Sequence, residues 1–271
     1  MYKLIAIDLD GTLLTDDLKV SPGTVKAIQQ AVEAGTIVTI ATGRMFASAK
    51  RFAKQLEINV PLITYQGAII MDVNEREVVY ERLISPDIAQ KLVEISAAKN
   101  VHLQVYQDDL LYGAVENEAL VSYAEGVNVP YTVEPDLHKL AEKGFTKALF
   151  IDSPENLDVL QEELKVLFGN RAHIAKSKPH FLEVTHPEAN KGLALLHLAK
   201  TLGIDQSEII GIGDNHNDRE LITTAGLGVA MGNAVQEMKD IADYVSLTNN
   251  EEGVKHVIEK FVLEPQRLSV E

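Results

Sequence analysis

The 271-residue sequence contains no cysteine and no long hydrophobic run. The lack of cysteine excludes disulfides, thiolate catalysis and zinc sites built on cysteine. No apolar run approaches the roughly 20 residues that a membrane-spanning helix needs. The N-terminal apolar stretch is too short for a signal peptide and ends at Asp8. We therefore expect a cytoplasmic enzyme that has no membrane partner.

Positive charge is also scarce. The chain has 25 lysines and arginines against 40 aspartates and glutamates, which gives a formal net charge of −15. Such a chain repels polyanions at long range, and its positive residues form no block along the sequence. We therefore expect no nucleic-acid partner. A small anionic substrate stays possible if a metal ion and one or two cations gather in one cleft.

Several catalytic motifs are missing as well. The sequence has no G-x-x-x-x-G-K-[ST] phosphate loop, no G-x-S-x-G turn and no H-E-x-x-H pair of histidines. These absences exclude the corresponding nucleotide-binding, serine-hydrolase and zinc-protease mechanisms in their usual form.

The two ends of the chain alternate between strand and helix patterns. Short apolar runs predict buried parallel strands, and 3.6-residue periodicity between them predicts helices. Ser21-Pro22 and Asn190 are typical of helix starts. The pattern indicates a doubly wound, Rossmann-like α/β domain with a parallel sheet. The expected strands are 3–7, 36–44, 61–70, 208–213, 227–230 and 243–247.

The middle of the chain mixes strands with longer helices and lies between the two similar α/β segments. We interpret residues 85–185 as an inserted α/β domain, a cap that selects the substrate. Residues 1–84 and 186–271 would together form the catalytic core. A monomer and a homodimer both agree with this organisation.

Polar residues follow several of the predicted strands. Ligands of open α/β sheets bind beyond the carboxyl ends of the strands, so residues at these places are expected to converge. A lysine also begins the helix that follows the insert. The residues are Asp8, Leu9 and Asp10; Thr42, Gly43 and Arg44; Lys191; and Asp214, Asn217 and Asp218.

These residue types suit phosphoryl chemistry. Asp8 and Asp214 can offer hard oxygens to Mg²⁺. Thr42, the backbone near Gly43 and the following helix start can hold phosphate oxygens, and Lys191 adds a point charge at a helix N-terminus. One of the two leading acids can be a nucleophile and the other a general acid and base. Each short motif also has a simpler interpretation, because D-G favours turns and a helix-start lysine is commonly solvated. Their order within one α/β frame favours the chemical interpretation.

Five stretches together resemble the haloacid dehalogenase superfamily, and more narrowly its Cof-type sugar-phosphatase branch. The resemblance covers essentially the whole chain, including an α/β cap inserted after the third core strand. The stretches are DLDGTLL (8–14), ATGR (41–44), NKG (190–192), GDNHND (213–218) and VAMGNA (229–234).

The resemblance implies a role for each matching residue. Asp8 would attack phosphorus, and Asp10 would protonate the leaving alcohol and then activate water. Mg²⁺ would lie between the Asp8 carboxylate, the Asp10 main-chain carbonyl and Asp214, with Asp218 nearby or in the second layer of contacts. The phosphate would be held by the Leu9 backbone, Thr42, Gly43, Lys191 and Asn217. The cap would close over the site, and Arg44 is our candidate for meeting the substrate.

The function that follows is a Mg²⁺-dependent phosphatase of small phosphorylated metabolites, such as sugar phosphates, with an aspartyl-phosphate intermediate. A phosphomutase of sugar phosphates and a non-catalytic phospho-acceptor or sensor module stay open as alternatives. One position departs from the pattern, since Gln66 stands where relatives usually have asparagine. This departure bears on substrate preference and leaves the nucleophile and the metal site intact.

Overall fold

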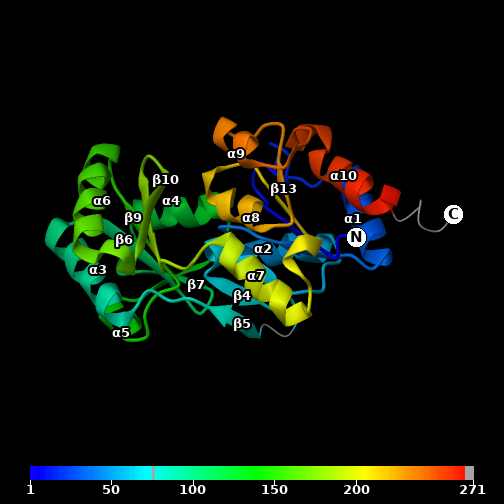
Figure 1. Cartoon of the computed structure of the whole chain (residues 1–271). Coiled ribbons are helices and arrows are strands. Elements are labelled where there is room, and N and C mark those ends of the chain that lie inside the picture. Colours follow the sequence, from blue (N-terminus) through cyan, green and yellow to red (C-terminus); the bar gives the residue numbers. More distant parts are fainter. Residues whose placement is uncertain (75–76, 266–271) are drawn as a thin grey trace. The chain divides into compact units, whose positions relative to one another are not determined.

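The computed structural model describes residues 1–74 and 77–265. It divides the chain into two compact units, one made of residues 1–80 and 190–271 and the other of residues 81–189. Figure 1 labels many of their helices and strands. Within the described ranges, no helix combines the length and the apolar character needed to cross a membrane.

A five-stranded sheet forms the centre of the first unit. Its order is β14-β13-β12-β1-β2, and all neighbouring strands are parallel. All residues of β1 and β12 are buried, which explains why these segments are apolar throughout. The predicted α/β class with a parallel core sheet is confirmed. The strands are β1 (Leu4–Ile7), β2 (Ile37–Ile40), β12 (Ile209–Gly213), β13 (Leu227–Ala230) and β14 (Tyr244–Val245).

Helices of the same unit pack against this sheet. Leu4 and Ala6 of β1 form a buried cluster with Leu195 and Leu198 of α7. Ser21 caps the N-terminus of α1, and its hydroxyl accepts a hydrogen bond from the Thr24 amide at 3.1 Å. The helices of the unit are α1 (Pro22–Glu33), α2 (Phe46–Gln55), α7 (Lys191–Leu202), α8 (Arg219–Thr224), α9 (Gln236–Ile241) and α10 (Gly253–Ile258), which continues as a π-helical turn (Glu259–Leu263).

The segment expected to be one strand over 61–70 is instead a hairpin. β3 (Leu62–Thr64) and β4 (Ile69–Met71) pair antiparallel around a 3₁₀ turn, and β5 (Val78–Glu81) completes a separate three-stranded sheet. Gln66 has a φ of 60° and Gly67 a φ of 94°, so the chain reverses there. The run is apolar because both strands of the hairpin are buried, and periodicity alone does not detect such a turn.

The second unit contains a six-stranded sheet of order β10-β11-β9-β6-β7-β8. One face of this sheet packs against α3, α5 and α6 in an apolar core. The strands are β6 (His102–Gln107), β7 (Leu110–Gly113), β8 (Tyr131–Val133), β9 (Lys147–Ile151), β10 (His173–Lys178) and β11 (Phe181–Thr185). The helices are α3 (Pro86–Lys99), α4 (Glu118–Val127), α5 (Leu137–Ala141) and α6 (Pro154–Phe168).

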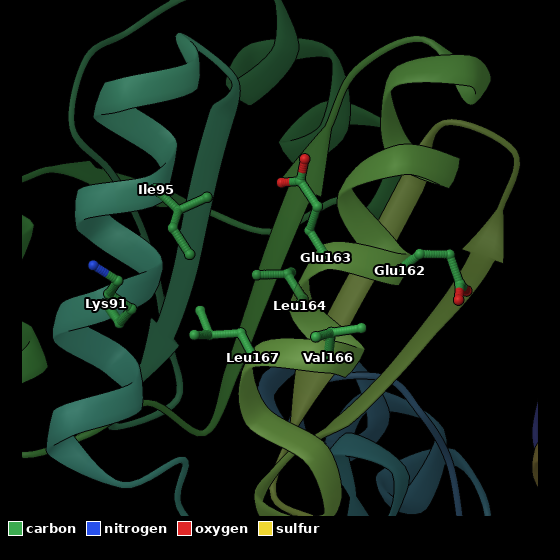
Figure 2. A pocket seen from close by; sticks show the side chains of 7 residues that line it. All are labelled: Lys91, Ile95, Glu162, Glu163, Leu164, Val166 and Leu167. Carbon is green, nitrogen blue, oxygen red and sulfur yellow. The ribbon is translucent and has the colours of Figure 1, made fainter.

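A hollow of about 620 Å³ lies between α3 and α6 of this unit (Figure 2). Ile95, Leu164 and Leu167 line it together with charged side chains that include Lys91. None of the acidic residues predicted for catalysis lines this hollow, so it is separate from the site described next.

Candidate active site

Two aspartates follow neighbouring strands at the same edge of the core sheet. β1 and β12 are parallel and Ile7 is in register with Ile212, so Asp8 and Asp214 both lie just beyond the carboxyl ends of their strands. The Asp8 amide donates to the Ile212 carbonyl at 3.0 Å, which extends the pairing to the site itself. The Asp8 side chain is buried, and Asp214 is partly buried.

Lys191 connects two of the acids from the start of α7. Its ammonium donates to Asp8 Oδ1 at 2.5 Å and to Asp218 Oδ1 at 2.6 Å. Lys191 and Asp218 are both fully buried. Asn190 caps the helix by accepting from the Leu193 amide at 2.8 Å, which fixes Lys191 as the first helical residue. The alternative of a solvated helix-start lysine is therefore wrong.

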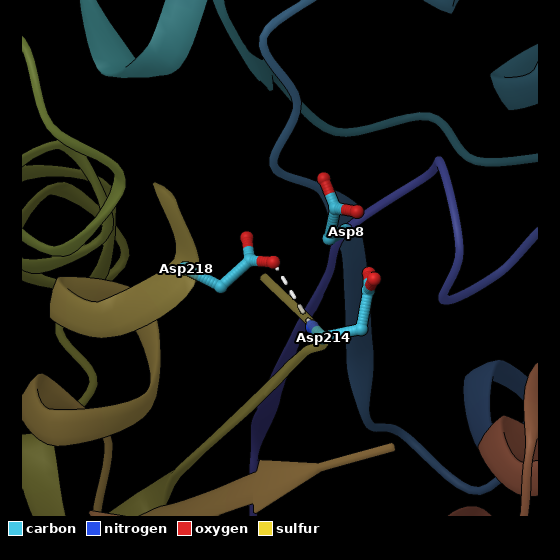
Figure 3. Close-up of side chains that lie close together, drawn as sticks. All are labelled: Asp8, Asp214 and Asp218. Atoms are coloured by element: carbon cyan, nitrogen blue, oxygen red, sulfur yellow. Dashed lines mark hydrogen bonds between the residues drawn. The ribbon is translucent and has the colours of Figure 1, made fainter. Parts of the chain in front are cut away.

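Asp218 also holds the loop that carries Asp214. Its second oxygen, Oδ2, accepts hydrogen bonds from the amides of Asp214 and Asn215, each at 3.0 Å. Figure 3 shows the first of these bonds and the three carboxylates close together. Gly213 has to be glycine because a Cβ there would lie 2.4 Å from the Asp218 Cβ. Loop and carboxylate therefore fix each other's position.

The three carboxylates form a group that fits a divalent metal ion. Oxygens of Asp8, Asp214 and Asp218 all lie within 4.8 Å of one another. Oxygen-only donors of this kind suit hard cations such as Mg²⁺. Three carboxylates and the one ammonium of Lys191 carry a formal charge of −3 + 1 = −2, which a divalent cation would balance. The donor set and the charge thus agree with a metal site.

The pKa values of these groups reflect the excess of negative charge. Burial raises the pKa of Asp8 well above its ordinary value, and the charge of Asp218 raises it further, with only partial compensation by Lys191. Burial raises the pKa of Asp214 to about 6, against a hydrogen bond from Thr12 that lowers it. Burial alone would lower the pKa of Lys191, but the charges of Asp218 and Asp8 outweigh burial and raise it. Lys191 therefore stays charged, and its one positive charge only partly offsets the repulsion among the carboxylates.

Asp10 lies outside this group of carboxylates. Its side chain is about half exposed and forms an ion pair with Arg44, whose Nε donates to Oδ2 at 2.7 Å and whose second guanidinium nitrogen contacts Oδ1. The guanidinium carbon of Arg44 also lies 5.4 Å from the centre of the Phe52 ring. Asp8 and Asp10 are thus in different environments. Asp8 is buried beside a lysine, and Asp10 forms an ion pair with an arginine at the surface.

Two of the predicted phosphate-binding residues, Gly43 and Asn217, lie against the side chain of Gln66. The Asn217 amide donates to Gln66 Oε1 at 3.1 Å, and a Cβ on Gly43 would lie 2.3 Å from Gln66 Nε2. Thr42 is buried, and its hydroxyl accepts from the Arg44 amide at 3.2 Å. Gln66 therefore connects the loop after β2 with the loop that carries Asn217. In the sequence, Gln66 was notable only because relatives usually have asparagine at this position.

Leu9 and two further residues shape the loop after β1. Leu9 is fully buried, and its carbonyl accepts from the Leu14 amide at 2.9 Å. Sequence reasoning did not assign a role to Thr12, whose hydroxyl donates to Asp214 Oδ1 at 2.7 Å. It also did not assign one to Asn233, whose amide donates to the Gly11 carbonyl at 2.8 Å. Thr12 lies in the DLDGTLL stretch and Asn233 in the VAMGNA stretch. Their presence in these stretches is the sequence feature that could have indicated a role in the site.

Comparison with known proteins agrees with this geometry. A family description of haloacid dehalogenase-like hydrolases matches residues 5–258. A protein from Thermotoga maritima with a known crystal structure is 40% identical to this chain in sequence. The two structures match with a TM-score of 0.89, and the match covers 96% of this chain and 98% of that one.

Two curated relatives have named substrates. A 5-amino-6-(5-phospho-D-ribitylamino)uracil phosphatase of Bacillus subtilis is 31% identical, and the match covers 95% of this chain and 97% of the relative. An HMP-PP phosphatase of Serratia proteamaculans is 32% identical, and the match covers 98% of this chain and 97% of the relative. The two names share the removal of phosphate from a small molecule and differ in the molecule.

Proposed function

We propose that this protein hydrolyses sugar phosphates in a Mg²⁺-dependent reaction with Asp8 as the nucleophile. The chain belongs to the haloacid dehalogenase-like hydrolases and is a phosphatase of small phosphorylated metabolites. The observation that carries the proposal is the placement of Lys191 between Asp8 and Asp218, with Asp214 in the same group of carboxylates. The expected resemblance to this superfamily is confirmed.

In the first step a carboxylate oxygen of Asp8 attacks phosphorus, and the bond from phosphorus to the substrate oxygen breaks. Asp10 gives the departing oxygen a proton, so that an alcohol leaves. In the second step Asp10 takes a proton from water, the water oxygen attacks phosphorus, and the bond to Asp8 breaks. The products are inorganic phosphate and the original Asp8 carboxylate.

The environments of the two acids support this division of roles. Asp8 is buried and fixed by Lys191, which suits a nucleophile that must approach one atom. Asp10 is half exposed, and among the described residues its side chain is paired with Arg44, which suits a group that exchanges protons with substrate and water. We propose that Arg44 orients Asp10 and meets the substrate.

Asp8, Asp214 and the main-chain carbonyl of Asp10 are the proposed metal-binding groups, with Asp218 nearby or in the second layer of contacts. A bound Mg²⁺ would supply positive charge that relieves the repulsion among the acids and stabilises the transferring phosphoryl group. Lys191 and Asn217, the Thr42 hydroxyl and the backbone at Leu9 and Gly43 would hold the phosphate oxygens. Support for these roles comes from the polar contacts that gather around Gln66 and Lys191.

We also propose that the second unit, residues 81–189, selects the leaving group. A cytoplasmic location and a monomeric or homodimeric state belong to the same proposal, and fractionation and sedimentation would test them. The names of the curated relatives favour hydrolysis over the phosphomutase and over a non-catalytic module.

The test is phosphate release from a panel of sugar phosphates, with Mg²⁺ and with a chelator. We expect release that depends on Mg²⁺ and that falls by at least about 10³-fold in Asp8→Asn, since the nucleophile is removed. Asp17→Asn, at an exposed aspartate of the following loop, is the matched control and should keep wild-type turnover. Wild-type turnover in Asp8→Asn would refute the covalent mechanism. Transfer of phosphate to a second hydroxyl, without release, would instead indicate a mutase.

A further inference from the structure

The turn between β3 and β4 holds two consecutive residues in the left-handed region of the backbone. Tyr65 has a φ of 52° and Gln66 a φ of 60°, and neither is glycine. This conformation is uncommon for side-chain-bearing residues other than asparagine and aspartate. Residues in such sparsely populated regions cluster at functional sites, because surrounding contacts must compensate for the strain. The contacts of this turn therefore indicate why the conformation is kept.

The backbone of the turn contacts two segments that carry proposed phosphate-binding residues. The Gln66 amide donates to the Thr42 carbonyl at 3.1 Å, which joins the turn to the loop after β2. The next residue, Gly67, has no room for a side chain, because a Cβ there would lie 2.2 Å from the carbonyl oxygen of Asn190. Asn190 caps α7, so the turn also packs directly against the start of that helix.

The side chain of Gln66 reaches a third such segment. Its Oε1 accepts a hydrogen bond from the Asn217 side-chain amide at 3.1 Å. Its Nε2 packs against the backbone of Gly43, where a Cβ would lie 2.3 Å away. Asn217 is exposed, and among the described residues no other hydrogen bond holds its side chain. Gln66 therefore determines how the Asn217 amide is oriented.

An amide whose orientation is fixed binds an anion better than one that rotates. The nitrogen of an asparagine side chain carries two hydrogens, so the bond to Gln66 uses one and leaves the other for a phosphate oxygen. A side chain that is ordered before the ligand arrives loses less conformational entropy on binding. The length of glutamine matters for this effect, because asparagine at position 66 would be one methylene shorter and would not span the same distance.

We infer that Gln66 is a positioning residue, which orients the amide of Asn217 for binding a phosphate oxygen. It acts through Asn217 and does not itself touch the reacting atoms. This inference rests on the proposed function, in which Asn217 holds the phosphate. Two consequences follow from it. The side chain of Gln66 contributes to phosphate affinity only when Asn217 is present, and a shorter side chain lowers that affinity even where it suits the backbone better.

The first test is a double-mutant cycle on the binding of inorganic phosphate, measured by calorimetry with Mg²⁺ present. Gln66→Leu keeps the bulk beside Gly43 and removes the acceptor, so we expect it to weaken binding by about 3–10-fold, the effect of one neutral hydrogen bond. The double variant with Asn217→Ala should bind within about 2-fold of Asn217→Ala alone. Single-variant losses that multiply in the double variant would overturn the inference. Gln55→Leu, at an exposed glutamine of α2, is the matched control and should bind like the wild type.

The second test separates positioning from a structural role by using Gln66→Asn. Asparagine tolerates the left-handed backbone better than glutamine, so the Tm of this variant should equal or exceed that of the wild type. Its affinity for phosphate should still fall by about 3–10-fold, because the shorter side chain does not reach Asn217. Unchanged affinity, or a loss of affinity together with a lower Tm, would overturn the inference. This variant also keeps the inference testable if Gln66→Leu does not fold.

Kinetics and binding together distinguish failure of this inference from failure of the proposed function. On a sugar phosphate that the wild type hydrolyses, Gln66→Leu should raise KM by about 3–10-fold and change kcat by less than about 3-fold, since it weakens binding of the phosphate before and during the reaction. A fall in kcat with unchanged KM would overturn the inference. If the wild type binds inorganic phosphate but releases none from any substrate, the proposed hydrolysis fails, and the double-mutant cycle still decides the role of Gln66. A wild type that binds no phosphate would overturn the inference.

Discussion

Replacing Lys191 by methionine tests whether the buried lysine holds the acidic group together. Methionine has nearly the same length and volume, so the change removes the charge and creates little cavity. In the native protein the ammonium contacts two carboxylates at 2.5 and 2.6 Å, and it is fully buried. In Lys191→Met, Asp8, Asp214 and Asp218 would face one another without a fixed cation.

The expected cost follows from these distances. At an effective dielectric constant of about 20, each contact contributes about 6 kcal/mol before the cost of burying the charges. Burial of an ion costs several kcal/mol, and removal of one partner from a buried pair has a net effect of about 3–5 kcal/mol. At about 2–4 °C for each kcal/mol in a chain of this size, Tm should fall by about 6–20 °C.

The loss of stability in Lys191→Met should depend on pH and on metal ions. The pKa of Asp8 is already raised by burial, and removal of Lys191 would raise it further. An acid with a raised pKa is better tolerated when protonated, so the stability difference should be smaller at pH 5 than at pH 8. Added Mg²⁺ should recover part of the loss at pH 8, because it supplies the missing positive charge.

The assay is thermal unfolding followed by circular dichroism at pH 5 and pH 8, with and without Mg²⁺. Lys200→Met is the control, since Lys200 is an exposed lysine near the other end of α7. The reasoning would be refuted if Lys191→Met unfolded within about 1 °C of the wild type at pH 8, or if its deficit were larger at pH 5.

Two more outcomes follow from the site. The pKa of Asp214 is raised from 3.8 to about 6, so the metal-free protein should lose up to about 3 kcal/mol of stability as pH rises through this interval. The rise in Tm that Mg²⁺ produces should correspondingly shrink below pH 6, and a rise that stays constant down to pH 5 would contradict this. Arg44→Ala should lower kcat by about 10–100-fold for alkyl phosphates and less for p-nitrophenyl phosphate, whose good leaving group needs little protonation. Arg51→Ala, an exposed neighbour on α2, is the control, and equal losses on both substrates would contradict a role of Arg44 in orienting Asp10.

The sequence was sufficient to predict the core sheet and the meeting of Asp8, Asp214 and Lys191. Parallel strands end at a common edge, so a residue that follows a buried strand has a predictable position. The helix cap at Asn190 likewise predicts that Lys191 lies in the first turn of the helix.

The sequence did not predict where the side chain of Asp10 lies, the hairpin at Gln66, or the bridge from Gln66 to Asn217. Each depends on a loop conformation or a side-chain rotamer that is determined by contacts distant in sequence, such as the ion pair with Arg44. The apolar run 61–70 fits a single strand and a buried hairpin equally well, because burial makes both apolar.

The bond between Asp8 and Lys191 joins residues 183 positions apart, and β1 pairs with β12, which begins at Ile209. At about 5–20 residues per second, a ribosome needs about 10–40 s to synthesise the chain between the two partners. During that time the nascent β1 has an unpaired edge, and Asp8 has no cation beside it. The second unit, which ends at residue 189, is synthesised completely before β12 can pair with β1. Chains that terminate before Lys191 would therefore lack both the charge balance of the acidic group and the neighbour of its central strand.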